Sequence, residues 1–280
     1  MDFGGEIISS RQNRTVVELC KLVDKKAREA TRTFRFDGVK LFEEAVKKGV
    51  EIPLVALRAS SAEGLRARLC ERLGRDAFLE VGRVLLLSDE LFDKISEEKS
   101  PEGIISIAKY IDKFQKNVTI YNSADFLSMK NERIVLLESV RDPANIGAII
   151  RSAAAIGVDR LIVSDDCADI YNPRAVRASM GTLFDQHIDR VADLPCVIRG
   201  LRERGRRVFA AALTDEAVRL GSFAVQKGDC VVIGNEGHGL TDQTVNACDG
   251  SVIIPMTARA ESFNAAVAAA ILMWEFIGQN

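Results

Sequence analysis

The sequence is poor in the residues that build metal and redox sites. Its 280 residues include two histidines, His187 and His238, and six cysteines that are scattered without a C-x-x-C pair. A structural zinc site needs a closely spaced set of Cys or His ligands, and a redox dithiol needs paired cysteines. We therefore expect no metal, and we interpret the isolated cysteines as small buried hydrophobic residues.

Long apolar runs are also missing. The longest, residues 265–274, is well short of the roughly 20 apolar residues that a membrane helix needs. The first ten residues, MDFGGEIISS, lack the basic and apolar regions of a secretory signal. We therefore expect a cytoplasmic protein with no membrane span.

Positive and negative charges nearly balance over the whole chain. The net charge is −2, which gives no sign of a polyanionic partner. Residues 11–40, however, hold nine Lys or Arg against four Asp or Glu, a composition that fits a basic face for RNA. A solvated amphipathic helix explains the same count equally well.

The length and the pattern of the chain predict two α/β domains. A chain of 280 residues suits two domains of ordinary size, and its 47% hydrophobic and 28% charged residues are typical of globular proteins. We place a first domain at 1–112, a linker at 113–130 and a second domain at 131–280. In the second domain, strands predicted at 134–140, 160–164, 208–213, 230–233 and 251–256 alternate with helices at 148–156, 173–184 and 262–278. Such alternation predicts a parallel sheet with helices on both faces.

The ligand site of an open parallel sheet lies beyond the carboxyl ends of its strands. RDPANIGAIIR follows the strand that ends at Val140. Arg151 and the free N–H groups of the following helix would form an anion site there. The alternative is that Asn145 caps this helix and that Arg151 is merely exposed.

Two further loops follow predicted strands. IGNEGHGL is rich in glycine, but it is neither a dinucleotide fingerprint nor a P-loop. His238 in this loop is a candidate acid or base, although loop histidines are more often bystanders. IPMTARAESFNAAVAAA leads into the terminal helix, where Ser262 is either a functional residue or a helix N-cap. That helix is apolar nearly all round, so it is expected to be buried on several sides, one of them against another subunit.

Taken in order, three stretches resemble the motifs of the SpoU (TrmH) family of RNA ribose 2'-O-methyltransferases, in the SPOUT superfamily. They are ESVRDPANIGAIIRSAAAIGVDRLIV, VVIGNEGHGL and IPMTARAESFNAAVAAAI, and the resemblance covers about residues 132–278. NPRAVRASMGTLF resembles the family's segment between the first two motifs. FRFDGVKLFEEA and PEGIISIA resemble, less sharply, the ribosomal-protein-like substrate-binding domain that often precedes the catalytic domain.

The resemblance implies a trefoil-knotted, parallel-sheet α/β domain that binds S-adenosylmethionine and forms a homodimer with active sites near its interface. It implies catalytic roles for Arg151, Asn145, Glu236, Ser262 and Asn264. It also implies cofactor contacts from Gly234, Asn235, Gly237, Ile254, Met256 and Phe263. The chain departs from the family pattern at Ala258, Phe263 and Ala265, and the larger Phe263 side chain puts the affinity for the cofactor in question.

The chemistry then requires a ribose 2'-hydroxyl that is aligned with the methyl sulfonium and loses its proton. A guanidinium with a pKa above about 12 is a poor base, so we expect Arg151 to grip the adjacent phosphate and orient the hydroxyl. Glu236 is expected to hold the loop or Asn145, and residues 11–40 of the first domain to contact the RNA phosphates.

We expect the substrate to be large-subunit ribosomal RNA, ahead of transfer RNA. A catalytically silent, knotted RNA-binding or ribosome-assembly protein is the alternative from another functional class. A Rossmann-type small-molecule methyltransferase is disfavoured, since no glycine-rich loop follows an early strand.

Overall fold

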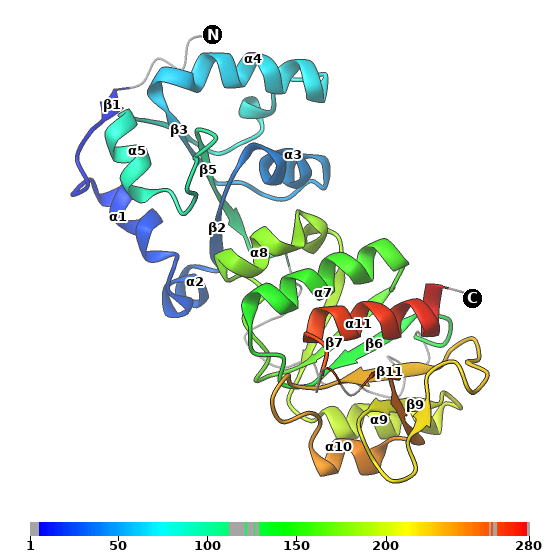
Figure 1. Cartoon of the computed structure of the whole chain (residues 1–280). Coiled ribbons are helices and arrows are strands. Elements are labelled where there is room, and N and C mark those ends of the chain that lie inside the picture. Colours follow the sequence, from blue (N-terminus) through cyan, green and yellow to red (C-terminus); the bar gives the residue numbers. More distant parts are fainter. Residues whose placement is uncertain are drawn as a thin grey trace. The chain divides into compact units, whose positions relative to one another are not determined.

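The computed structural model describes residues 6–111, 121, 126, 129–257, 259 and 262–278 (Figure 1). Most of the linker predicted at 113–130 lies outside these residues, and so does Ala258. The contacts between residues divide the chain into two compact units. The first consists of Met1–Ile111 with Asp169–Asp185, and the second of Asp112–Ala168 with Gln186–Asn280.

The first unit is built on a mixed five-stranded sheet in the order β1-β4-β3-β5-β2. β1, β4 and β3 are parallel, and β5 runs antiparallel to both β3 and β2. Its strands are β1 (Ile7–Ile8), β2 (Thr33–Asp37), β3 (Leu54–Arg58), β4 (Val84–Leu87) and β5 (Ile104–Lys109). Its helices are α1 (Arg14–Lys21), α2 (Lys25–Thr31), α3 (Val39–Lys47), α4 (Ala62–Leu73), α5 (Asp89–Ile95) and α8 (Pro173–Ser179), with 3-10 turns η1 (Ala59–Ser61), η2 (Ala77–Leu79) and η3 (Thr182–Phe184).

The basic segment 11–40 is not one amphipathic helix. It forms α1 and α2, with a break after Lys21, and then β2. The guanidinium of Arg28 donates to the carbonyl oxygens of Leu22 and Val23 in this break and pairs with Asp169 at 2.7 Å. The basic count therefore overstates the available surface, because Arg28 and Arg35 are both buried.

Residues 169–185 pack within the first unit, although they follow the second unit's strand β7 in the chain. Tyr171 stacks on Tyr110 with ring centroids 3.9 Å apart, and Phe184 lies 5.4 Å from Phe36. Helix α8 packs on β2 (Figure 1). The alternation of strand and helix signals did not predict that residues 169–185 pack in the first unit, because this packing depends on aromatic contacts between residues that are distant in the sequence.

The second unit contains the predicted parallel sheet, with seven strands in the order β10-β12-β9-β11-β6-β7-β8. Every neighbouring pair is parallel. The strands are β6 (Ile134–Leu137), β7 (Arg160–Ser164), β8 (His187–Val191), β9 (Val208–Ala211), β10 (Val218–Arg219), β11 (Cys230–Ile233) and β12 (Gly250–Ile253). The helices are α7 (Pro143–Ile156), α9 (Leu194–Glu203), α10 (Asp242–Ala247) and α11 (Ala265–Met273), which continues into the π-helical turn η4 (Trp274–Gly278).

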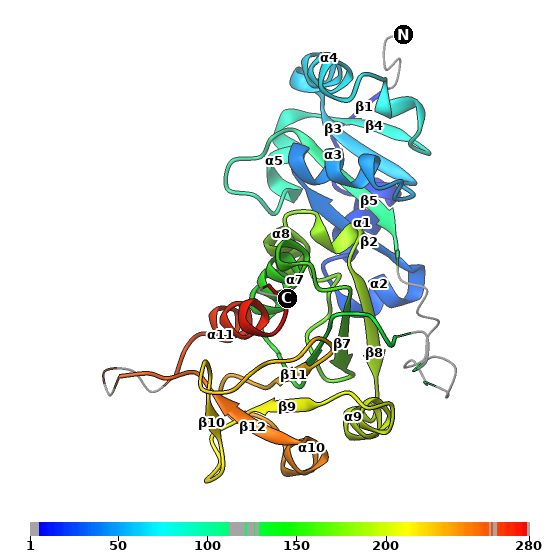
Figure 2. The same cartoon turned by 90° about the vertical axis from the view of Figure 1, so that its right-hand side faces the viewer.

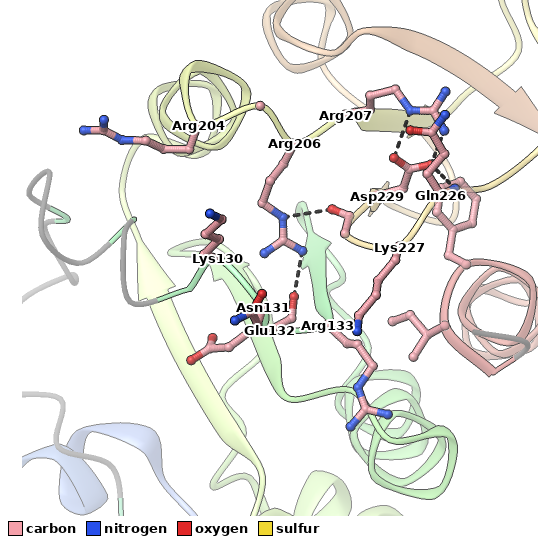
Figure 3. Close-up of a pocket in the computed structure, with 14 residues that line it drawn as sticks. Lys130, Asn131, Glu132, Arg133, Arg204, Arg206, Arg207, Gln226, Lys227 and Asp229 are labelled. Carbon is pink, nitrogen blue, oxygen red and sulfur yellow. Dashed lines mark hydrogen bonds and ion pairs between the residues drawn. The ribbon is translucent and has the colours of Figure 1, made fainter.

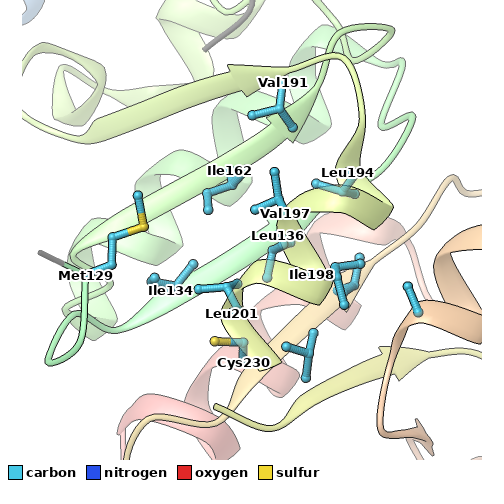
Figure 4. Packing of buried hydrophobic residues seen from close by; sticks show 13 residues of the cluster. Met129, Ile134, Leu136, Ile162, Val191, Leu194, Val197, Ile198, Leu201 and Cys230 are labelled. Atoms are coloured by element: carbon cyan, nitrogen blue, oxygen red, sulfur yellow. The ribbon is translucent and has the colours of Figure 1, made fainter. Parts of the chain in front are cut away.

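Helices cover both faces of this sheet, as the alternation predicted. Figure 2 shows α7 and α11 on one face and α9 and α10 on the other. The core under α9 joins Leu194, Ile198 and Leu201 to strand residues such as Ile134 and Ile162, all of them buried (Figure 4). The trefoil knot that the resemblance implies remains a prediction.

Two of the strands that the sequence pattern did not predict, β2 and β8, each bury a charge. Arg35 in β2 pairs with Asp37 at 2.8 Å, and Asp189 in β8 accepts from Arg160 of β7. Burial alone would raise the pKa of the Asp189 carboxyl, but hydrogen bonds from His187, Tyr121 and Arg160 hold it below its ordinary value. Buried ion pairs of this kind hide the apolar alternation by which a strand is predicted.

The terminal helix is shorter than its predicted range of 262–278. Asn264, and not Ser262, is its N-cap, because the Asn264 Oδ1 accepts from the backbone N–H groups of Ala266 and Val267 at 3.0 and 3.4 Å. Within the described part of the chain, no helix is long and apolar enough to cross a membrane.

Candidate active site

The three motif loops meet at the carboxyl edge of the parallel sheet. They follow β6, β11 and β12, and the sheet order places β11 beside β6, with β9 between β11 and β12. A pocket of about 600 Å³ opens there. Its walls include residues 211–213 at the end of β9, 233–236 at the end of β11, 252–257 at the end of β12, and the segment around the start of α11.

Most of the residues expected at the site line this pocket. Its walls include the expected Gly234, Asn235, Glu236, Ile254, Met256, Ser262 and Phe263. Gly237, Asn145, Asn264 and Arg151 are not among the lining residues. The loop after β9 was missed, because only the strand order reveals that β9 lies between the two strands that carry the second and third motifs.

Three polar side chains from the three motifs form a continuous chain at the pocket. The side-chain amide of Asn264 donates to the Asn145 Oδ1 at 3.0 Å. The Asn145 Nδ2 in turn donates to the Glu236 Oε1 at 2.6 Å. The expectation that Glu236 holds Asn145 agrees with this contact, while the catalytic roles of the three residues remain predictions.

Asn235 fixes the shape of the glycine-rich loop. Its Nδ2 donates to the carbonyl oxygen of Ser139 at 2.8 Å, which ties the second motif to the first. Its Oδ1 accepts from the N–H groups of Gly237 and His238 at 2.8 and 3.1 Å. Gly237 thus builds the loop from outside the pocket, and the exposed His238 contributes its backbone to the same turn.

Gly234 is required by the close approach of two backbone segments. A Cβ atom at this position would lie 2.5 Å from the carbonyl carbon of Gly239 and 2.7 Å from the backbone nitrogen of Leu240. These are backbone atoms, so they have no freedom to move aside. Only a glycine therefore lets the loop fold back on itself this closely.

Glu138, at the end of β6, is a structural residue of the site that the sequence reasoning missed. Its buried carboxylate accepts from the Thr241 backbone N–H at 2.8 Å, from the Thr241 hydroxyl at 3.0 Å and from the Thr244 hydroxyl. These bonds hold the far end of the loop that follows β11. An acidic residue directly after a buried apolar strand was the available signal, because a buried carboxylate needs donors nearby.

The predicted anion site at the start of α7 is wrong, and so is the alternative that Asn145 caps this helix. Asp142 is the N-cap, and its Oδ1 accepts from the N–H groups of Ala144 and Asn145 at 2.7 and 3.0 Å. A carboxylate therefore occupies the position where an anion would bind. Arg151 lies in the third turn of α7 and is exposed, not in the first turns as expected.

A second carboxylate, Asp166, braces the turn after β6. It accepts from the hydroxyls of Ser139 and Ser164, and from the Arg141 guanidinium at 3.1 Å. Burial alone would raise the pKa of this carboxyl, but these hydrogen bonds outweigh burial and hold the pKa below its ordinary value. Asp166 is therefore charged at neutral pH and keeps Ser139, whose carbonyl holds Asn235, in place.

The pocket fits S-adenosylmethionine by its size and by its lining. A volume of about 600 Å³ is typical of a site for a small molecule. Apolar side chains such as Ile233, Ile253 and Leu272 form its walls, and Gly234 also lines it. Glu236 adds a carboxylate, which suits a cationic sulfonium.

The fold and the pocket define an α/β enzyme with a parallel-sheet catalytic unit and a smaller mixed-sheet unit. Residues 132–274 match the SpoU rRNA Methylase family, and residues 13–106 match the MRM3-like substrate binding domain. The chain belongs to the SpoU rRNA Methylase family.

Full-length relatives support this assignment. The chain is 30% identical over 278 residues to the 23S rRNA (guanosine(2553)-2'-O)-methyltransferase RlmP of Bacillus subtilis, covering 97% of this chain and 99% of the relative. It is also 30% identical to the 23S rRNA (uridine(2479)-2'-O)-methyltransferase of Streptomyces viridochromogenes, over 98% and 92% of the two chains. A crystal structure of an AdoMet-bound rRNA methyltransferase from Sinorhizobium meliloti is 26% identical, with a TM-score of 0.77 and 97% of both chains covered.

Proposed function

We propose that this protein uses S-adenosylmethionine to methylate a ribose 2'-hydroxyl of 23S ribosomal RNA. One observation carries the proposal: the second and third motif loops line one pocket, and hydrogen bonds join Asn145 of the first motif to Glu236 and Asn264. The match along the whole chain to two 23S rRNA ribose methyltransferases supports this substrate. Those relatives modify a guanosine and a uridine, so the ribose is the shared target rather than one base.

Within the second unit, the residues of the chain would bind and orient the reactants. When bound, the cofactor would supply a methyl group on a sulfonium, whose transfer to the ribose oxygen releases a neutral thioether, a good leaving group that needs no metal to activate it. The loop at Gly234 and Asn235, with Ile254, Met256 and Phe263, would hold the cofactor. The hydrogen bonds that join Asn264, Asn145 and Glu236 would hold these three side chains in place beside the cofactor. Ser262 would hydrogen bond to the ribose.

Arg151 is proposed to grip the phosphate next to the target ribose and to orient the hydroxyl. Its exposed side chain on α7 is free to meet a phosphate. A planar guanidinium binds phosphate through two parallel hydrogen bonds, which a lysine cannot reproduce. We expect Arg151→Lys to lose most of the turnover while S-adenosylmethionine binding is kept, and near-normal turnover would overturn this role.

The active form is proposed to be a homodimer. Val267 and Trp274 lie seven residues apart along α11 and η4, so they share one side of this segment, and they are 47% and 57% exposed. Large apolar side chains exposed on a helix whose other residues are buried or partly buried favour a subunit interface. Analytical ultracentrifugation is expected to give a dimer for the native chain and a monomer for Trp274→Glu with Val267→Glu.

The first domain, 1–112, is proposed to bind RNA, with 131–280 as the catalytic domain and 113–130 as the link between them. In the segment 11–40, Arg11, Lys21 and Lys26 are exposed and make no ion pair within the described part of the chain. Phosphate contacts by such residues weaken as salt is raised. Affinity for RNA that did not change with salt would contradict this assignment.

A methyl-transfer assay tests the proposed function. Purified protein and tritiated S-adenosylmethionine are incubated with total RNA from a strain that lacks the protein, and the RNA species are then separated. We expect label in 23S rRNA, at a ribose 2'-hydroxyl when the site is mapped. Label in transfer RNA would make this a tRNA methyltransferase, and no label in any RNA would favour a silent RNA-binding protein.

A further inference from the structure

The second unit has another hollow, at the opposite edge of its sheet from the active-site pocket. It has a volume of about 380 Å³ and is lined by residues 130–133, 204–207 and 226–229, with Phe276 and Ile277 (Figure 3). These three stretches directly precede β6, β9 and β11. Because the strands are parallel, this amino edge lies about 13 Å from the carboxyl edge, for strands of four residues at 3.3 Å each.

Arg206 ties the three stretches together. Its guanidinium donates to the carbonyl oxygens of Met129 and Glu132, both at 2.7 Å, and to that of Gly228 at 2.8 Å. Arg206 is buried, and no carboxylate is among its contacts in the described part of the chain. A buried cation that is held only by carbonyl dipoles keeps its positive charge unneutralised, so the hollow has a fixed positive centre.

The acidic groups around the hollow are already paired. Asp229 accepts from Arg207, and Glu132 accepts from Arg160 at 2.6 Å. Arg133 is also paired, with Asp159 at 2.9 Å. The lining therefore carries an excess of positive charge that its own carboxylates do not cancel.

Lys130 and Lys227 are two lysines in the lining of the hollow that are not neutralised by a carboxylate in the described part of the chain. Both are exposed, and neither takes part in an ion pair within the described ranges. Figure 3 shows them on either side of the Arg206 guanidinium, whereas the side chain of Arg204 points away from it. The three positive groups Lys130, Arg206 and Lys227 therefore line one concave surface.

Phe276, one of the residues that line the hollow, belongs to an aromatic cluster. Phe276 packs edge-on against Phe209 and Phe223, with ring centroids 5.7 and 6.2 Å apart. Phe276 is buried, so its ring is not available to stack on a base. The hollow thus offers charge without a surface that reads a base.

We propose that this hollow binds the phosphate backbone of the RNA substrate, away from the methylated nucleotide. The inference rests on the proposed function. A site for a small anion would aim several buried donors at one point, but each guanidinium nitrogen of Arg206 already donates to a carbonyl oxygen. Two exposed lysines beside a fixed positive centre suit a polyanion that is recognised by charge and not by sequence.

The test compares the native chain with Lys130→Gln/Lys227→Gln, and with Arg204→Gln as the matched control. Arg204 lines the same rim, but its side chain points out of the hollow. Binding of a 23S rRNA transcript is measured over a series of salt concentrations. In the double variant we expect the slope of log affinity against log salt to fall by about 1.4, the value for two single-strand phosphate contacts. Arg204→Gln is expected to keep the native slope.

Kinetics and a small-anion titration complete the test. The double variant is expected to raise the KM for RNA, while kcat and the KM for S-adenosylmethionine stay native. A native salt slope in the double variant would overturn the inference. Calorimetry would also overturn it if inorganic phosphate bound the native chain but not the double variant, and if this phosphate did not compete with RNA. Failure of the native chain to methylate RNA would instead count against the proposed function, and the salt slope reports on the hollow independently of activity.

Discussion

Asn145 and Glu236, which lie 91 residues apart in the chain, are joined by a 2.6 Å hydrogen bond from the Asn145 amide to the Glu236 carboxylate. The bond connects the first motif of the SpoU family to the second, and Asn264 adds the third by donating to Asn145 at 3.0 Å. A side-chain amide suits the central position, since it accepts through its oxygen and donates through its nitrogen at the same time.

Asn145→Asp tests whether the hydrogen bonds that join Asn264, Asn145 and Glu236 matter for catalysis. An aspartate at this position accepts from Asn264 but places a negative charge against Glu236, so the two side chains repel each other. We expect kcat to fall about hundredfold, the size of effect that a small misplacement of catalytic groups produces. Steady-state methyl transfer to 23S rRNA measures this, with Asn246→Asp, an exposed asparagine of α10, as the control. A near-normal kcat would show that these hydrogen bonds have no catalytic role.

Glu138→Gln tests the brace beneath the second motif. The new amide would turn an N–H group toward donors of Thr241 or Thr244, and it removes a buried charge that accepts three hydrogen bonds. We expect a loss of about 1.5–3 kcal/mol in the free energy of unfolding, together with weaker S-adenosylmethionine binding. Urea denaturation and calorimetry measure the two effects, with Glu203→Gln on the surface of α9 as the control. Unchanged binding and stability would mean that the loop is held by other contacts.

Two glycines of one loop give a matched pair of variants. Gly234→Ala places a Cβ atom 2.5 Å from the backbone of Gly239, whereas at Gly237 the nearest atom is the Asn235 Oδ1 at 3.5 Å. We expect Gly234→Ala to abolish detectable S-adenosylmethionine binding and Gly237→Ala to change it less than threefold. Equal affinities in the two variants would contradict the close approach of the loop's two strands.

The cysteines predict a dependence of alkylation on pH. Burial raises the pKa of the Cys230 thiol to about 11 and that of Cys248 to about 12. Since the thiolate is the reactive form, iodoacetamide at pH 8 is expected to modify the exposed Cys196 and to leave Cys230 and Cys248 intact. Mass spectrometry of tryptic peptides measures this, and rapid labelling of Cys230 in the native protein would contradict it.

The same two thiols are expected to lower stability in alkaline solution. The pKa values of both thiols in the folded protein lie above the ordinary value of 9.0, so their contribution to the free energy of unfolding is fully present below pH 9. It is lost as the pH rises from about 9 through the folded values. Urea denaturation at pH 8 and pH 10.5 is expected to show a smaller loss of stability for Cys230→Ala than for the native chain.

The interpretation of the cysteines as buried hydrophobic residues was right only in part. Cys167 and Cys230 are buried, Cys20, Cys70 and Cys248 are partly buried, and Cys196 is exposed. Composition gives a tendency for a residue type, whereas the position of Cys196 in the first turn of α9 decides its exposure.

Local periodicity predicted the regular parts of the second unit well. β6, β7 and β11 are apolar runs that a sheet covered on both faces requires. β7 and β11 have their predicted bounds, whereas β6 ends at Leu137 and not at Val140. The points at which helices are interrupted were harder to predict from the sequence. The amphipathic helix considered for residues 11–40 divides because Arg28 satisfies the carbonyl oxygens of Leu22 and Val23, a contact that no spacing of apolar residues reveals.

The order of the motif residues by itself determined the family, and alternation determined the parallel sheet, because both are properties of neighbours along the chain. Tertiary structure alone decided that Asn145 meets Glu236, that Asp142 caps α7 and that Glu138 braces the loop after β11. It also decided that Lys130, Arg206 and Lys227 face one hollow. The physical reason is that strand order brings together segments about a hundred residues apart, and hydrogen bonds and charges act over distances in space and not along the sequence.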